Sequence, residues 1–149
     1  MANSFKDSRF ALRKRANERK ENTREEKAVA GDLPKVMFSF KDFDKTQIPP
    51  GQSYEDWQDK GYLAYLLEKL SHISELNMIE AKQQKYITEY GAFPAKSDFK
   101  HPRHIAQNVN WAVIKKIKGQ KGRVAGHIID NVFYIVFLDF DHKFWLMDR

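Results

Sequence analysis

The polar residues at the end of the last apolar run of this chain are its best candidates for chemistry. Four of them directly follow that run: Asp139, Asp141, His142 and Lys143. The segment before the run carries cations and another histidine: Lys121, Arg123 and His127. Histidine takes up and releases protons near neutral pH, carboxylates orient it, and Lys or Arg stabilises developing negative charge. The alternative is a charged turn beside solvated strand ends, because turns are usually polar.

A β-hairpin would bring these two groups of residues together. The first arm alternates in polarity from Val124 to Ile128, and the second arm, residues 132–138, is dense in β-branched and aromatic residues. Between them stands Asp130-Asn131, a pair that tolerates the positive φ of a two-residue turn. Because the second arm is apolar on both faces, we expect a central strand in a sheet covered by helices on its other side.

The residues before the hairpin predict the elements that support it. Residues 35–43 alternate as a first strand and are followed by a loop that contains Pro49-Pro50-Gly51. The apolar spacing predicts a helix from Ser53 to Ile73, in which Asp56 completes a capping box. A shorter helix is expected over residues 77–84, with Ser74 in its cap.

The remaining segments complete the expected architecture. Residues 86–102 mix turn and aromatic residues and are predicted as an irregular connection, whereas residues 108–117 alternate as another strand. Tyr62 and Tyr65 widen the apolar stripe of the long helix, so we expect them in the core rather than as base-stacking platforms. The predicted fold class is α+β, an antiparallel sheet of about four to five strands with two helices packed on one face, in the order β-α-α-β-β-β.

Length and composition are those of one domain. The chain has 149 residues, of which 42% are hydrophobic, and it contains no cysteine. We expect a charged N-terminal arm over residues 1–30, helical or disordered, and a single domain over residues 31–149. No apolar run is long enough to span a membrane, and the first residues lack the apolar core of a secretory signal. These features predict a cytoplasmic protein without a membrane partner.

Positive charge is concentrated in the N-terminal arm and in the segment that leads into the hairpin. The formal net charge of the chain is +6, and residues 96–123 contain eight basic residues and one acidic residue. Such a distribution is typical of a surface that binds a polyanion, although surplus lysine can also serve only solvation. The expected nucleic-acid-binding residues are Arg103, Lys115, Lys116, Lys118 and Lys121.

Neither a metal nor another cofactor is predicted. His101 and His104 have a spacing that occurs in metal sites, but no cysteine or adjacent carboxylate pair completes a ligand set. The glycine-containing turn 118–122 lacks the Walker pattern for nucleotide binding.

The order of elements and the end of the chain resemble a known superfamily. Residues 122–126 read Gly-Arg-Val-Ala-Gly and precede an alternating strand and a charged, aromatic end. In this respect residues 35–149 resemble the RelE/ParE-like superfamily of bacterial toxins. A closer resemblance is to a set of small bacterial proteins whose last hairpin reads GxxxxxxFxIxxLDxDxxF, and this second likeness implies no particular activity. Here that pattern is formed by Gly126, Phe133, Ile135, Leu138, Asp139, Asp141 and Phe144.

The toxin resemblance implies a metal-independent endoribonuclease that acts on RNA or the ribosome and is paired with an antitoxin protein. In such a mechanism His142 would be the general base or acid, oriented by Asp139 or Asp141, and His127 the second proton carrier. Arg123 and Lys143 would then stabilise the charge on the phosphate.

A binding module is the alternative to an enzyme. The same basic surface would hold nucleic acid or an acidic protein without turning it over, as in an accessory protein of phage or plasmid origin. Phosphate contacts would make the affinity fall steeply with salt.

Overall fold

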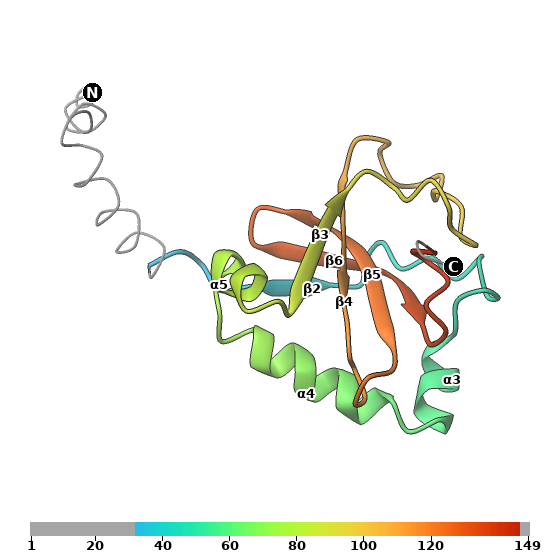
Figure 1. Cartoon of the computed structure of the whole chain (residues 1–149), viewed down its shortest axis with the longest axis horizontal. Coiled ribbons are helices and arrows are strands. Elements are labelled where there is room, and N and C mark those ends of the chain that lie inside the picture. Colours follow the sequence, from blue (N-terminus) through green and yellow to red (C-terminus); the bar gives the residue numbers. More distant parts are fainter. Residues whose placement is uncertain (1–31, 147–149) are drawn as a thin grey trace. The chain divides into compact units, whose positions relative to one another are not determined.

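The domain is an α+β fold, as the sequence predicts. The structure is a computed structural model that describes residues 32–146, and the residues from Pro34 onward form one compact unit. The expected N-terminal arm, residues 1–30, lies outside the described residues. Figure 1 shows the elements in chain order: β2 (Met37–Ser39), α3 (Tyr54–Asp59), α4 (Leu63–Ile73), α5 (Met78–Gln83), β3 (Ile87–Gly91), β4 (Asn110–Ile114), β5 (Arg123–Ile129) and β6 (Val132–Asp139).

The five strands form one mixed sheet in the order β2-β6-β5-β4-β3. The strand β6 lies between β2 and β5, which confirms the predicted central strand. The pair β2 and β6 is parallel, whereas the other three pairs are antiparallel. The predicted sheet was antiparallel throughout. A parallel pair needs a long connection, and the whole helical region and three strands separate β2 from β6.

The predicted hairpin turn is present at Asp130 and Asn131. Asp130 has a φ of 55°, a conformation that Asp tolerates because its short polar side chain can bond locally. The Asn131 side chain donates to the carbonyl of Lys35 at 2.9 Å, and the Asn131 carbonyl accepts the N–H of Met37 at 2.9 Å. The turn of the hairpin therefore also fixes the start of β2.

The predicted long helix is two helices, so that the described residues contain three. Ser53 and Asp56 form the expected capping box at the start of α3. The break between α3 and α4 falls at Gly61, whose φ of 76° is favourable only for glycine. The third helix, α5, is capped by Asn77 and not by Ser74, which ends α4. Among residues 32–146 no helix is both long enough and apolar enough to cross a membrane.

A strand replaces part of the expected irregular connection. Residues 86–102 include β3, which pairs antiparallel with β4 at the edge of the sheet. Only Ile87 is fully buried in β3, so the segment lacks the alternation that identifies a strand locally. Its hydrogen bonds come from β4, which is distant in sequence, and the sequence pattern therefore missed it.

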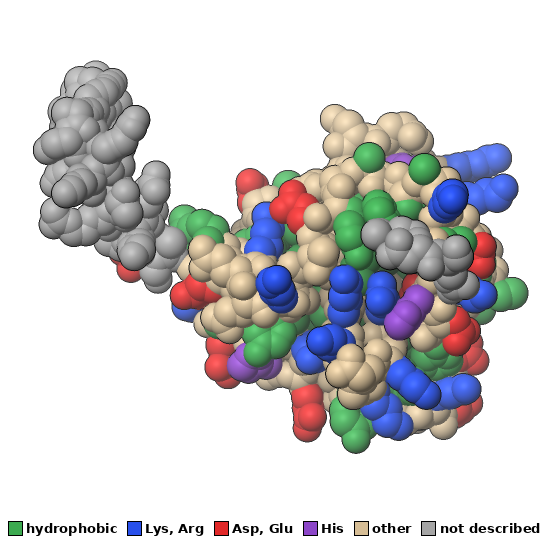
Figure 2. Space-filling model, viewed as in Figure 1, with side chains coloured by type: hydrophobic (Ala, Val, Ile, Leu, Met, Phe, Trp, Pro, Cys, Tyr) green, Lys and Arg blue, Asp and Glu red, His purple; other side chains and the backbone are tan. Residues whose placement is uncertain are grey.

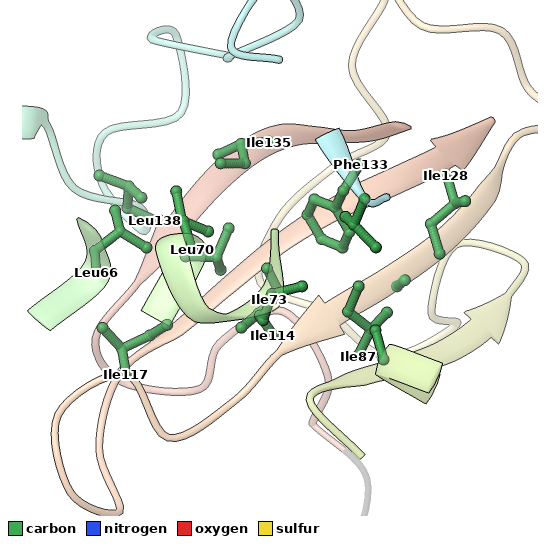
Figure 3. Packing of buried hydrophobic residues seen from close by; sticks show 14 of the residues in the cluster. Leu66, Leu70, Ile73, Ile87, Ile114, Ile117, Ile128, Phe133, Ile135 and Leu138 are labelled. Atoms are coloured by element: carbon green, nitrogen blue, oxygen red, sulfur yellow. The ribbon is translucent and has the colours of Figure 1, made fainter. Parts of the chain in front are cut away.

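Two apolar layers bury the sheet on both faces. One face is covered by α3, α4 and α5, and Figure 3 shows Leu66, Leu70 and Ile73 of α4 among the sheet side chains. The opposite face is covered by the 92–109 connection and the end of the chain, and its buried residues are Phe99, Ile105, Trp111, Val113, Ala125, Val136, Phe137 and Phe144. The strands β4, β5 and β6 are consequently rigid supports for any group at their ends.

Candidate nucleic-acid interface and acid–base site

Asp139 organises the chain where β6 ends. Its side chain is fully buried, and its two oxygens accept the backbone N–H groups of Lys143 at 2.8 Å and Phe144 at 3.0 Å. These two bonds close the residues after β6 into a turn, in which His142 has a φ of 60°. Phe144 is buried in the sheet face and anchors the far side of this turn. The Asp139 carboxylate therefore fixes the backbone that carries His142 and Lys143.

Three of the predicted site residues gather around this carboxylate. Arg123, the first residue of β5, is the direct strand partner of Asp139. Burial raises the pKa of Asp139 above its usual value. The backbone bonds from Lys143 and Phe144 and the charges of His142 and Arg123 act in the opposite direction but offset only part of the effect. The hairpin thus brings Arg123, His142 and Lys143 to one end of the sheet, as expected.

The other acidic groups near this end are more exposed. Asp141 lies on the exposed side of the turn after β6. Lys143 pairs with Asp98 of the 92–109 connection at 3.8 Å. An exposed pair at that separation contributes little to stability, so the Lys143 ammonium remains accessible to an anion.

His127 lies elsewhere on β5 and does not join His142. It lies four positions from Arg123, which corresponds to about 13 Å along an extended strand. Its side chain is only 3% exposed, and its Nε2 is bonded to Oδ2 of Asp42 at 2.9 Å. The ring stacks on Tyr134, with centroids 4.8 Å apart. His127 is therefore a buried residue with its own partner, and the structure does not bring the two predicted proton carriers together.

Asp42 is the partner of His127, and the sequence did not reveal this pairing. Burial alone would raise its pKa, but hydrogen bonds from His127 and Lys41 hold the pKa below the usual value. The carbonyl of Asp42 also accepts Nε2–H of His104 at 2.8 Å. These contacts fasten the segment after β2 to the sheet. A histidine in an apolar strand indicates that another residue must hydrogen-bond to its ring. Only the pairing of β2 with β6 shows that this residue is Asp42.

The predicted nucleic-acid-binding lysines surround the tight turn between β4 and β5. Lys118 and Lys121 exchange two backbone hydrogen bonds of 2.9 Å across it. The Lys118 ammonium lies over the rings of Tyr62 and Tyr65, at 5.3 and 5.4 Å from their centroids. Lys115 lies over the Tyr90 ring at 5.9 Å. Cations and aromatic rings are thus interleaved at this end of the sheet.

The basic turn and the Asp139 cluster lie at the same end of the sheet. The register places the start of β5, which follows the turn, opposite the end of β6, which precedes His142. Figure 2 shows Lys and Arg side chains gathered over this part of the face seen in Figure 1. We call the surface formed by Lys115, Lys116, Lys118, Lys121, Arg123, His142 and Lys143 the basic rim.

Arg103 lies apart from the basic rim. It lines a different groove of about 590 Å³ together with Asp44, Lys100 and His104. Asp44 there is bonded to Thr46 and Gln47. Within residues 32–146, no group of three or more His, Asp or Glu side chains is arranged to hold a metal ion.

Comparison with known proteins assigns no family to this chain. It matches no family model, no curated protein and no solved structure. The likeness to RelE/ParE-like toxins therefore rests on the expected order of elements and the sequence pattern alone.

Proposed function

We propose that this chain binds RNA through the basic rim. The observation that carries the proposal is the pairing of Arg123 with Asp139, because this register brings the lysine-rich turn and the cations after β6 to the same end of the sheet. Lysine and arginine side chains on such a surface neutralise phosphates and release counterions, which drives binding without sequence preference. The setting we propose is the cytoplasm, with messenger or ribosomal RNA as the partner.

Removal of two rim lysines should lower the salt dependence of RNA binding. Lys116 and Lys121 are exposed, and for single strands each neutralised phosphate contributes about −0.7 to the slope of log K against log salt. The variant Lys116→Ala/Lys121→Ala should therefore bind labelled single-stranded RNA more weakly at low salt, with a slope shallower by about 1.4. Fluorescence anisotropy titrations between about 50 and 200 mM salt measure this change.

A matched variant tests whether the position of the charge matters. Lys35→Ala/Lys45→Ala removes the same charge from two exposed residues that are not part of the rim. This control should retain nearly the whole affinity and slope of the original chain. Equal losses of affinity in the two variants would show that binding depends on net charge and not on the rim. Absence of RNA binding by the original chain at low salt would reject the proposal.

A second candidate function is RNA cleavage, as in a toxin paired with an antitoxin. The observation that favours it is the location of His142, which interacts with the buried carboxylate of Asp139 beside Arg123. In this arrangement His142 would accept the proton of a ribose 2′-hydroxyl, and the 2′-oxygen would attack the phosphorus and displace the 5′-oxygen, which would take its proton from water. Arg123 and Lys143 would stabilise the charge on the phosphate. His127 takes no part, because its ring is buried against Asp42.

His142→Ala should then abolish RNA cleavage and growth inhibition while leaving the melting temperature nearly unchanged. A group that transfers a proton contributes about 10² to 10⁴ in rate. Induced expression in bacteria, followed by growth curves and total-RNA integrity, measures the effect. His104→Ala, which removes an exposed histidine outside the rim, is the control. Intact RNA on expression of the original chain would reject cleavage and leave binding in place, and undiminished toxicity of His142→Ala would exclude His142 from the mechanism.

A further inference from the structure

A groove of about 510 Å³ separates α4 from the turn between β4 and β5. The helix, the residue before β3 and the turn all contribute to it, and its lining is Tyr65, Glu68, Lys69, His72, Tyr86, Lys116, Ile117 and Gly119. Two aromatic rings and two lysines thus face one hollow. The groove adjoins the basic rim, with which it shares Lys116.

Tyr65 is exposed at the mouth of this groove. The apolar stripe of α4 predicts a core position for it, yet 46% of Tyr65 is accessible, whereas its neighbour Leu66 is buried. The Lys118 ammonium lies 5.4 Å from the centre of its ring. An exposed ring that has a cation beside it offers both a stacking surface and a partner for a phosphate.

The opposite wall of the groove is held in place by its own contacts. The Tyr86 hydroxyl and Nε2 of His72 are 3.0 Å apart, and their rings meet edge to face at 4.9 Å. Lys69 lies over the Tyr86 ring at 5.7 Å. These side chains are therefore ordered before any ligand arrives. This order reduces the entropic cost of binding, because fewer side chains have to be immobilised.

The chemistry of the lining selects nucleotides over other anions. Lys69 and Lys116 outweigh the single carboxylate of Glu68, so that the groove attracts negative charge. An acidic peptide would satisfy the lysines but would leave the Tyr65 ring without a planar partner. An unpaired nucleotide supplies a flat base and a phosphate together.

We propose that this groove binds unpaired bases of RNA, with Tyr65 as the stacking platform and Lys69 and Lys116 as phosphate contacts. The proposal rests on RNA binding by the basic rim and specifies its substrate as single-stranded. Bases inside a duplex are stacked on one another and cannot reach Tyr65, so a duplex can contact only the cations.

Tyr65→Ala should weaken binding of a short labelled oligouridine about tenfold, because stacking on one aromatic side chain contributes roughly this much. Binding of an RNA duplex of the same length should be unchanged, and so should the salt slope, because no charge is removed. Tyr65→Phe keeps the ring and should bind as tightly as the original chain. Anisotropy titrations of both RNAs measure these values.

Two further variants separate stacking from folding. Tyr65→Leu keeps apolar bulk but lacks a ring face, so it should lose as much affinity as Tyr65→Ala. Leu67→Ala alters a residue of the same helix that is 59% exposed and does not line the groove, and it should bind normally. Thermal melting of each variant verifies the fold.

The outcomes distinguish this inference from the function on which it rests. If the original chain binds neither RNA, the proposed function itself is rejected. If it binds oligouridine and Tyr65→Leu binds equally well, only the stacking groove is rejected. Equal losses on oligouridine and on the duplex would also overturn the groove while leaving the basic rim in place.

Discussion

Gly126→Ala should destabilise the domain by about 3 kcal/mol, the upper end of the range for overpacked interiors. A Cβ on Gly126 would lie 2.0 Å from the Tyr134 carbonyl oxygen and 2.7 Å from Cε1 of Phe133. The first of these atoms belongs to the backbone of β6 and cannot rotate away. The substitution therefore forces the two central strands apart.

The surroundings of Gly126 oppose the separation of β5 and β6. Next to it the register of β5 and β6 shifts by one residue, because Gly126 faces Ile135 whereas Ala125 faces Phe137. Such a bulge bends the strand and brings backbone atoms close together. On its other side β5 is paired along its length with β4, so it has no free edge toward which to relax.

Urea unfolding of the isolated chain measures this effect, and Gly119→Ala is the matched control. Gly119 lies in the turn between β4 and β5 with a φ of 61°, and a Cβ there would meet nothing within 4 Å. Gly119→Ala should lose only about 1 kcal/mol of stability, because alanine is strained in the left-handed backbone conformation. Similar losses of unfolding free energy in both variants would show that the close approach at Gly126 does not add to the destabilisation.

Asp139→Ala should also cost about 3 kcal/mol. The substitution leaves the backbone N–H groups of Lys143 and Phe144 without their acceptors, which lie at 2.8 and 3.0 Å. A buried donor that loses its partner costs about 1 to 3 kcal/mol. Since these bonds also shape the turn that carries His142, the same variant should weaken any activity that depends on His142.

Asp139→Asn separates the hydrogen bonds from the charge. Asparagine retains an acceptor oxygen but cannot ionise, so it should preserve much of the stability that alanine loses. Burial raises the pKa of Asp139 above 3.8, and the folded protein therefore binds the proton more tightly than the unfolded chain. The ionised carboxylate thus reduces the free energy of unfolding at pH values above its folded pKa.

The raised pKa of Asp139 determines how the free energy of unfolding depends on pH. As the pH falls through the folded pKa of Asp139 toward 3.8, the original chain should gain stability relative to Asp139→Asn, and the difference should be constant above that pKa. Urea unfolding of both proteins over this range measures the difference. A difference of opposite sign would mean that the backbone hydrogen bonds and the charged neighbours stabilise the carboxylate more than burial penalises it.

Local sequence patterns were sufficient to predict much of the fold of this protein. The hairpin at Asp130-Asn131 follows from two alternating arms and a pair of residues that tolerates positive φ. The capping box of Ser53 and Asp56 is likewise readable, because its bonds join residues three positions apart. The α+β class follows from the same signals. Each of these features depends on residues close in sequence, whose preferences act before any distant contact forms.

The composition of the candidate site depended partly on contacts that no local pattern specifies. Without the bulge beside Gly126, Arg123 would face Leu138, and the shift of one residue places it opposite Asp139 instead. The distant segment after β2 supplies the Asp42 acceptor of the buried His127. Tyr65 was expected in the core but is exposed beside the turn.

The sequence by itself therefore determined the elements, their caps and the hairpin, because short-range preferences and alternation act within a few residues. The tertiary structure decided the parallel pairing of β2 with β6, the strand β3 and the partner of His127. Periodicity tells which face of a strand is apolar but not which distant strand it will meet. That choice depends on packing of the whole domain, and it places His142 with Arg123 but not with His127.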